Sequence, residues 1–324
     1  MRLLVIGGTR FVGRHLIEAA LAAGHDVTLV HRSPTSLFPS ARHVLADRDV
    51  DLSGLADGDW HATVDVCAYL PGQVRSLAAA LAGRGGHHVL VSSVSVYAEL
   101  PGPGGGEDSA VLPVAGDDVD EVTDTSYGPL KVACERAASA AYGDRLAVVR
   151  PTYVVGPNDP TGRYSWWVRR MARGGQVLAP GAPDDPAQVV DVRDLADFQL
   201  RLATGQIAGL FNAVRPTLAW SELLEATAVI APADTTLTWV DPKWLTEQGV
   251  TGADLPLWSE GVVDWQSAMS PARAEAAGLV HRPLAEIVRD TAAWAADDHL
   301  VDGVGLTTAR EAELLARWTN FRNS

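Results

Sequence analysis

The feature that most constrains this chain is a strand, a glycine-rich turn, a helix and a second strand within its first 31 residues. An apolar run, Leu3–Ile6, leads into the turn Gly7–Gly13 (GGTRFVG), and apolar residues then recur at helical spacing as far as Ala23. Gly24 ends that helix, and Asp26–His31 is the next strand. Two strands joined through a helix run parallel, so the sequence predicts a βαβ unit and a parallel sheet.

Strand-like and helix-like segments keep alternating as far as residue 150. Six strands with intervening helices predict a doubly wound parallel α/β sheet of the Rossmann type. Beyond Pro151, proline and glycine become dense, and seven of the ten tryptophans lie from Trp220 onward. After the first βαβ unit, strands are predicted at 43–46, 63–67, 88–92, 146–150 and 188–191, and helices at 73–81, 127–141, 164–173 and 192–202.

Length and the change of pattern predict two unequal domains. A chain of 324 residues is longer than one small core requires. We expect residues 1–157 to form a dinucleotide-binding domain, with 187–215 returning to it. Residues 158–186 and 216–324 are expected to form a smaller, tryptophan-rich domain that binds the substrate or closes over it.

The net charge of −14 is concentrated in one acidic stretch, residues 98–126, which has no lysine or arginine. We expect this stretch to be a solvated surface loop, and a flap near the active site is the alternative. The overall negative charge argues against nucleic acid or an anionic membrane as a partner. The acids of the stretch are Glu99, Glu107, Asp108, Asp117, Asp118, Asp120, Glu121 and Asp124.

The two cysteines, Cys67 and Cys134, form no close-spaced motif, which makes a reducing compartment the default. Met1–Ile6 enters a strand after a single charge, which predicts no signal peptide. No apolar run approaches the ~20 residues of a transmembrane helix. The histidines show no metal-ligand spacing, so no metal is expected. These observations predict a cytoplasmic protein that acts on a small molecule.

The glycine turn predicts a site for the pyrophosphate of a dinucleotide. A strand that ends in glycines and opens a helix points backbone N–H groups and the positive helix end at such an anion. Gly7 permits the tight turn, and Gly13 lets the helix pack close to the strand. Arg10 takes the place of a middle glycine, and Arg32 stands where NAD-selective enzymes carry an acid. Two arginines there favour NADP(H) over NAD(H), unless both are only surface residues.

Tyr127 and Lys131 lie four residues apart in a predicted helix, on one face of it. A phenol beside an ammonium can donate or accept a proton, because the positive charge favours the phenolate. Pro129 falls in the same segment and is tolerated only near the first turn of a helix. We therefore expect the helix to begin at or just after Tyr127.

Five ordered motifs together resemble the extended or atypical short-chain dehydrogenase/reductases, the NAD(P)-dependent epimerase/dehydratase superfamily. The resemblance covers most of residues 1–215. The GGTRF form of the turn is similar to that of a reductase-like branch that includes isoflavone-reductase-like proteins. Members are often homodimers. The motifs are GGTRFVG at 7–13, SSVSVY at 92–97, YGPLK at 127–131, RPTYVVGP at 150–157 and VDVRD at 190–194.

The resemblance implies roles for single residues. Ser93 would orient a substrate carbonyl, Tyr127 would be the acid/base, and Lys131 would hold the nicotinamide ribose. Further candidates for binding the substrate are Ser95, Tyr153, Arg163 and Trp166. For Cys67 a small buried residue without chemistry is the alternative reading. The residues expected to bind the cofactor are Gly7, Thr9, Arg10, Phe11, Val12, Gly13, Arg32, Asp47, Arg48, Cys67, Ala68, Tyr127, Lys131, Pro151 and Val154.

Departures from the family pattern narrow the expected reaction. Sugar-nucleotide dehydratases of this type carry Asp-Glu where this chain has Val94 and Ser95, which do not move protons, so dehydration is not expected. Many members that bind nucleotide sugars have Asn where Tyr153 stands, and an aromatic there suits an apolar substrate better. Three arginines could still hold an anion: Arg163, Arg169 and Arg170.

We therefore expect an NADP(H)-dependent reductase of a carbonyl, or of an activated double bond, in a small hydrophobic molecule. An epimerase or dehydrogenase of nucleotide sugars is the first alternative. A protein that binds the dinucleotide without catalysis is the second, because fold alone does not fix function.

Overall fold

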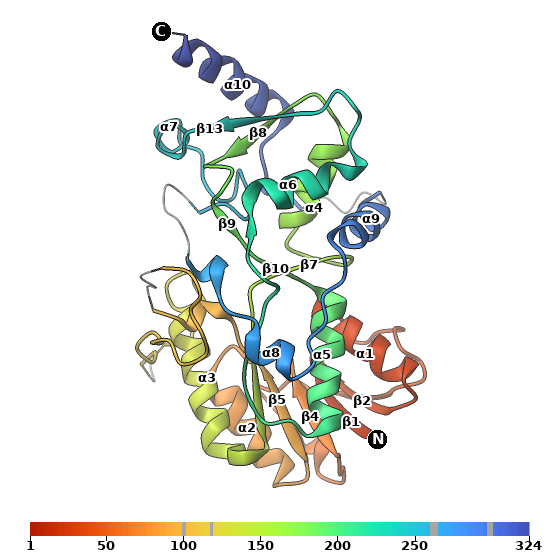
Figure 1. The fold of residues 1–324 in the computed structure, drawn as a ribbon. Helices are drawn as coiled ribbons and strands as arrows, with labels where there is room; N and C mark the ends of the chain where they lie inside the picture. The colour runs from red at the N-terminus through yellow and green to blue at the C-terminus, as the bar shows by residue number, and fades with distance from the viewer. Residues whose placement is uncertain (99–101, 117–118, 260–264, 297–300, 324) are drawn as a thin grey trace. The chain divides into compact units, whose positions relative to one another are not determined.

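The computed structural model divides into two compact units (Figure 1). The first comprises residues 1–152, 192–216 and 269–281, and the second comprises 153–191, 217–268 and 282–324. Residues 269–281 thus belong to the sheet-bearing unit, whereas the sequence pattern groups them with the C-terminal domain. The physical reason is Met269, which is buried with Val96 and Tyr97 of the first unit. The residues described are 1–98, 102–116, 119–259, 265–296 and 301–323.

The first unit is built on a seven-stranded parallel sheet, which confirms the predicted doubly wound Rossmann-type fold. The strand order is β11-β6-β5-β4-β1-β2-β3, so β1 lies between β4 and β2 at the point where the winding direction reverses. Ligands of such sheets bind at the carboxyl ends of the strands beside this point. The strands are β1 (Arg2–Ile6), β2 (Asp26–His31), β3 (Arg42–Leu45), β4 (Ala62–Asp65), β5 (His87–Val91), β6 (Leu146–Pro151) and β11 (Gly209–Ala213).

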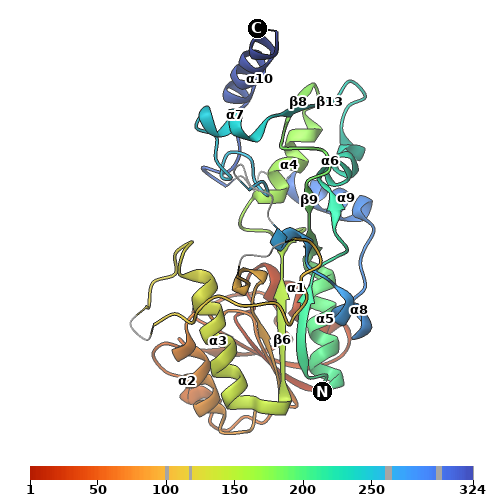
Figure 2. The same cartoon turned by 60° about the vertical axis from the view of Figure 1, so that its left-hand side comes forward.

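Helices cover both faces of this sheet. The pair α2 (Pro71–Leu81) and α3 (Tyr127–Tyr142) lies side by side on one face, and α1 (Phe11–Ala22) packs with α5 (Val192–Gly205) on the other (Figure 1, Figure 2). The apolar stripe of α2 is buried against β1, as the helical periodicity predicts. The helix after residue 126 begins at Tyr127, so Pro129 occupies its first turn, where an N–H has no helical partner.

One strand of the sheet was not predicted. β11 has the sequence GLFNA, which lacks β-branched residues and alternation, and its strand character comes from pairing with β6. Conversely, the predicted strand at 188–191 forms as β10 (Val189–Asp191) but pairs with β7 (Tyr153–Val155) in the second unit. Both differences arise because partner choice in a sheet depends on tertiary context.

The second unit combines three two-stranded sheets with helices around one apolar core. Trp167, Trp220 and Trp244 are buried in that core. Among the described residues, no helix is both long and apolar enough to cross a membrane. Besides β7 and β10, the unit contains β8 (Gln176–Pro180), β9 (Pro186–Ala187), β12 (Leu218–Ala219), β13 (Thr236–Val240), α4 (Arg163–Ala172), α6 (Trp220–Thr227), α7 (Pro242–Glu247), α9 (Leu284–Ala295) and α10 (Thr308–Arg322).

The described part of the acidic stretch is anchored at several points, although it was expected to be a solvated surface loop. Glu107 is 6% exposed, its Oε1 accepts a hydrogen bond from the backbone N–H of Asn212 at 2.9 Å, and its Oε2 lies 3.5 Å from Arg273 Nε. Arg273 belongs to α8 (Ala272–Ala276), in the returning segment of the first unit. Glu99, Asp117 and Asp118 lie outside the described residues.

Candidate functional site

The glycine turn is tight at the two positions the sequence singles out. Gly7 has a φ of +75°, and a Cβ added there would lie 2.5 Å from Cys67 Sγ. A Cβ on Gly13 would lie 2.3 Å from the carbonyl oxygen of Gly7. Any side chain at either position would push helix α1 or the loop after β4 away from the turn. The geometry therefore fits the cradle that a pyrophosphate requires, with Thr9, Arg10, Phe11 and Val12 leading into the helix.

The end of β2 presents an arginine and no acid. His31 is 7% exposed, and its ring nitrogens contact the Ser33 carbonyl oxygen at 2.7 Å and His43 Nδ1 at 2.9 Å. Arg32 is exposed, as is Arg10. The structure thus leaves both predicted arginines accessible at the carboxyl edge of the sheet. Their contact with a cofactor phosphate stays a prediction.

Lys131 joins three segments at this edge. It is 3% exposed, and its Nζ donates hydrogen bonds to the carbonyl oxygens of Ala68 at 2.8 Å and Val91 at 2.7 Å. Val91 ends β5, Ala68 follows β4, and Lys131 lies one turn along α3 from Tyr127. Burial lowers the pKa of Lys131, and the nearby Cys134, Tyr69, Asp65 and Glu135 oppose that shift. The pair predicted from sequence is therefore held where β4 and β5 end.

Ser93 lies next to the first turn of α3. It caps a short turn, Val94–Val96, accepts a hydrogen bond from Ser95 N at 3.1 Å and donates one to Ser95 Oγ at 3.0 Å. A Cβ on Gly128 would lie 2.3 Å from the carbonyl oxygen of Ser95, so the helix carrying Tyr127 packs directly on this turn. The tertiary structure thus brings the serine turn to the start of the Tyr127 helix. Val94 is a buried apolar side chain.

Tyr69 is an unpredicted member of this group. Its ring centroid lies 6.4 Å from that of Tyr127, with the planes inclined at 44°, and 5.4 Å from Lys131 Nζ. Burial raises the pKa of Tyr69, and the Lys131 charge opposes the rise. The available sequence signal was its place directly after Cys67 and Ala68, the residues expected beside the cofactor.

Arg48 does not stand free for the predicted adenine contact. It is 8% exposed; Nη1 and Nη2 donate to the two carboxylate oxygens of Asp65 at 2.8 and 2.7 Å, and Nη2 also donates to the Gln73 carbonyl oxygen at 3.0 Å. Burial alone would raise the pKa of Asp65, but Arg48 outweighs it and holds that pKa below its ordinary value. This ion pair ties β4 to the segment after β3, and the adenine contact of Arg48 stays a prediction. Asp47, whose Oδ1 accepts from Asp49 N, keeps its predicted role as a prediction.

Cys67 packs against the glycine turn and shows no sign of an activated thiol. Burial raises its pKa to about 11, so the thiol is protonated at neutral pH. Its Sγ lies 3.5 Å from the Ile6 carbonyl oxygen. Cys67 is only partly buried, and its contacts are those of a small packing residue without a chemical role.

The candidates in the second unit form their own cluster. The Arg163 guanidinium carbon lies 4.9 Å from the ring centroid of Tyr153, and Arg163 Nε donates to Thr161 Oγ1 at 3.1 Å. Trp166 meets Trp167 edge-on at 4.8 Å. Val154 pairs with Val190 between β7 and β10. Pro151, in contrast, ends β6 in the first unit.

Of the three arginines considered as ligands for an anionic substrate group, Arg170 is already paired with a carboxylate. It is buried, and its Nε donates to Glu311 Oε1 at 2.7 Å while Nη1 donates to the Gly174 carbonyl oxygen at 2.9 Å. Arg169 contacts Ser165 Oγ at 3.3 Å and the Ala295 carbonyl oxygen at 3.5 Å. Arg163 and Arg169 are both partly exposed, and a role for either of them in binding an anion stays a prediction.

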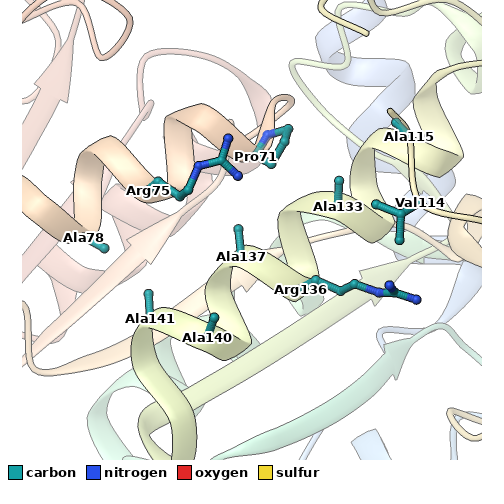
Figure 3. Close-up of a pocket in the computed structure, with 10 residues that line it drawn as sticks. All are labelled: Pro71, Arg75, Ala78, Val114, Ala115, Ala133, Arg136, Ala137, Ala140 and Ala141. Atoms are coloured by element: carbon teal, nitrogen blue, oxygen red, sulfur yellow. The ribbon is translucent and has the colours of Figure 1, made fainter. Parts of the chain in front are cut away.

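A groove of about 510 Å³ lies between α2 and α3 and contains none of the predicted site residues (Figure 3). Its walls are mostly alanine, with Arg75 extending from α2 and Arg136 from α3. No group in it combines a nucleophile with a base, so we do not assign chemistry to it.

Comparison with known proteins agrees with this geometry. The family model described as "NAD dependent epimerase/dehydratase family" matches residues 3–72 and 65–212. The chain is 23% identical over 224 residues to the chloroplast stem-loop binding protein of 41 kDa b of Arabidopsis thaliana. That alignment covers 65% of this chain and 58% of the relative, so less than two thirds of the relative's length is matched.

Solved structures with the same fold include several enzymes described as complexes with NAD. UDP-glucuronic acid 4-epimerase from Bacillus cereus, in complex with NAD, has a TM-score of 0.68 and 15% identity, covering 94% of this chain and 100% of that one. The enzyme WbmH of Bordetella bronchiseptica, in complex with NAD+, has a TM-score of 0.69 and 18% identity, covering 92% and 99%. A putative epimerase from Burkholderia cenocepacia has a TM-score of 0.65 and 22% identity, covering 92% and 97%.

The TM-scores establish a shared fold, and the family match extends from the glycine turn through Lys131 to β11. They do not separate out the reductase-like branch that the GGTRF motif resembles. The chain belongs to the NAD-dependent epimerase/dehydratase family.

Proposed function

We propose that this protein uses a nicotinamide dinucleotide to oxidise a hydroxyl-bearing carbon of a small molecule to a carbonyl, or to reduce such a carbonyl, with Tyr127 moving the proton. The observation that carries the proposal is the buried Lys131 ammonium, fixed to the Ala68 and Val91 carbonyls one helical turn from Tyr127. The serine turn packs against the same end of α3. A proton donor, a cation and a hydroxyl gathered at the carboxyl edge of a doubly wound sheet suit carbonyl chemistry.

Each residue then has a definite task. The nicotinamide supplies or accepts a hydride when bound. The N–H groups of residues 7–13 would hold its pyrophosphate, and Lys131 would bind its ribose. Ser93 would donate a hydrogen bond to the substrate oxygen. Tyr127 would give its phenolic proton to that oxygen during reduction and take it back during oxidation.

A nucleotide sugar is the substrate class that the comparisons support best. Several neighbours of the same fold are described as UDP-sugar epimerases or as complexes with UDP-sugars. Arg163, stacked on Tyr153, is the residue we assign to an anionic substrate group. In such a reaction Tyr127 would serve twice, first as base and then as acid.

Reduction of a hydrophobic carbonyl compound is the second candidate. The aromatic Tyr153 and the apolar Val94 favour it, because neither residue supplies a charge to a polar substrate. Under either reaction the partner is a small molecule in the cytoplasm. The net charge of −14 opposes binding to nucleic acid, although the Arabidopsis relative is named for stem-loop binding. A homodimer remains part of the proposal.

Tyr127→Phe tests the mechanism directly. We expect turnover of UDP-sugars, or of a ketone panel, to fall by about 10²–10⁴-fold because the acid/base is lost. Dinucleotide affinity, measured by fluorescence titration, should hardly change. Tyr142→Phe is the matched control, because it removes a phenol from the opposite end of the same helix α3. Equal turnover in Tyr127→Phe and wild type would refute the mechanism. Binding of dinucleotide with no turnover of either panel would favour the non-catalytic alternative.

The cofactor preference is tested separately. Preference for NADP(H) is supported by Arg10 and Arg32, both exposed, and by the absence of an acid at the end of β2. Replacing Arg10 by Gly and Arg32 by Asp should lower the NADP/NAD affinity ratio by about tenfold or more, the size of a lost charge-assisted hydrogen bond. Isothermal titration with both dinucleotides measures the ratio. An unchanged ratio would remove the NADP assignment.

A further inference from the structure

Two backbone carbonyl oxygens and one aromatic ring surround the buried Lys131 ammonium. Its two hydrogen-bond acceptors in the described part of the chain are both backbone carbonyls, at 2.8 and 2.7 Å. The face of Tyr69 covers another side, with Nζ 5.4 Å from the ring centroid. That distance lies within the ~6 Å at which an aromatic face attracts a cation. The aromatic face therefore lies beside a charge that is almost fully removed from solvent.

The position of Tyr69 is fixed by a hydrogen-bonded loop. Gln73 Oε1 accepts from the backbone N–H groups of Tyr69 at 2.9 Å and Leu70 at 3.2 Å. Gln73 Nε2 in turn donates to the Asp49 carboxylate at 2.9 and 3.0 Å, and the Gln73 carbonyl accepts from Arg48. The ring thus lies over Lys131 because its loop is anchored on two sides.

The same ring separates the ammonium from solvent. Tyr69 is 45% exposed, while Lys131 behind it is 3% exposed. On its other flank the ring lies 6.4 Å from the Tyr127 ring, measured between centroids. Since a charge acts several-fold more strongly in a dry environment than in water, a cover over the ammonium strengthens its effect on a nearby phenol.

We propose that Tyr69 is a positioning residue of the proton-transfer site, whose ring shields the Lys131 ammonium from water so that its charge acts on the Tyr127 phenol. The inference rests on the proposed proton-transfer role of Tyr127. It assigns the effect to the aromatic face of Tyr69 and not to its hydroxyl. Phenylalanine should therefore replace Tyr69, and an aliphatic residue should not.

The test follows tyrosinate formation by ultraviolet absorbance during a pH titration of the whole protein. The step missing in Tyr127→Phe identifies the ionisation of Tyr127. In Tyr69→Phe this step should keep its wild-type midpoint. In Tyr69→Leu it should move upward by about one pH unit, the effect expected when a nearby cation becomes screened. Tyr69→Met, whose longer and more flexible side chain adapts to the space of the ring, serves as a second non-aromatic variant if Tyr69→Leu does not fold.

The Lys131→Met variant shows whether the Tyr69 ring affects the ionisation of Tyr127 through the Lys131 charge. With Lys131→Met in place, Tyr69→Leu should cause no further shift. A wild-type midpoint in folded Tyr69→Leu or Tyr69→Met would overturn the proposal, and so would an equal shift in the Lys131→Met background. The titration needs no substrate, so its failure is distinguishable from a failure of the proposed function, which the turnover of Tyr127→Phe decides.

Discussion

Each unit of this protein contains a buried arginine–carboxylate pair, and the two pairs serve different ends. In the first unit Arg48 binds both oxygens of Asp65, 17 residues away, at the carboxyl edge of the sheet. In the second unit Arg170 binds Glu311, 141 residues away, and Glu311 Oε1 also accepts from Leu178 N at 3.1 Å. One pair braces the loop that carries Tyr69, and the other fixes the C-terminal helix α10 to α4 and β8.

The comparison shows that a buried arginine–carboxylate pair can support a functional site or only the fold, depending on which segments it joins. Because Arg48 also donates to the Gln73 carbonyl, damage to the first pair reaches the loop over Lys131. The second pair instead joins α4, β8 and α10 within the second unit. The units can be followed separately, since nine of the ten tryptophans lie in the second unit and only Trp60 lies in the first.

Breaking each pair should give the largest effects. Asp65→Asn and Glu311→Gln each leave a buried arginine without its carboxylate, which costs about 3–5 kcal/mol of stability. We expect Asp65→Asn to weaken dinucleotide binding as well, whereas Glu311→Gln should shift mainly the unfolding followed by tryptophan fluorescence. Glu313→Gln, on the exposed side of the same helix α10, is the control and should leave the unfolding midpoint nearly unchanged. Loss of dinucleotide affinity in Glu311→Gln equal to that in Asp65→Asn would contradict the distinction.

Lowering the pH should destabilise the first unit, because the buried His88 is harder to protonate in the folded chain than in the unfolded chain. This ring is fully buried and stacks on Tyr142 at 3.9 Å, and neither ring nitrogen has a hydrogen-bond partner among the described residues. Burial lowers the pKa of His88 from 6.5 to about 4. Between those values the unfolded chain binds a proton that the folded chain does not. Stability is therefore complete above pH 6.5 and falls by roughly 3 kcal/mol as the pH drops to 4.

The variant His88→Phe keeps a ring against Tyr142 and removes the titrating group. Urea unfolding followed by far-ultraviolet circular dichroism at several pH values should show a smaller acid loss in this variant. Asp65 affects stability at lower pH than His88. Because the pKa of Asp65 is lowered, its contribution to the free energy of unfolding is lost only below about pH 4. Identical acid profiles for wild type and His88→Phe would show that His88 does not titrate as its burial implies.

The smallest effect contrasts two glycines of the first unit. A Cβ at Gly13 would lie 2.3 Å from the Gly7 carbonyl oxygen, so Gly13→Ala should cost about 1–3 kcal/mol by overpacking and weaken dinucleotide binding. Gly72, in the first turn of α2, has no atom within 4 Å of an added Cβ. Gly72→Ala should be neutral or stabilise the protein by about 0.4–1 kcal/mol. Thermal unfolding with and without NADPH measures both, and equal behaviour would remove the steric role of Gly13.

Local pattern was enough for most of the first unit. The turn at residues 7–13, the start of α3 at Tyr127 and six of the seven sheet strands follow from periodicity and turn chemistry, which depend on neighbours within a few residues. The Tyr127–Lys131 spacing was readable for the same reason, since residues four apart share a helix face. β11 was missed because its sequence carries no such pattern.

Only the tertiary structure determined the contact partners of the buried charged and aromatic side chains. Arg48 was expected at adenine and is bound to Asp65, Arg170 was considered for an anion and is bound to Glu311, and Glu107 of the acidic stretch is buried beside Asn212. Tyr69 gained its place over Lys131 from a strand end and a helix that lie 62 residues apart in the chain. The sequence by itself determined the parallel sheet, the glycine cradle and the residues able to move a proton. The partners of each charge came from the fold, because desolvation and ion pairing depend on which distant segments meet, and short-range periodicity does not encode that.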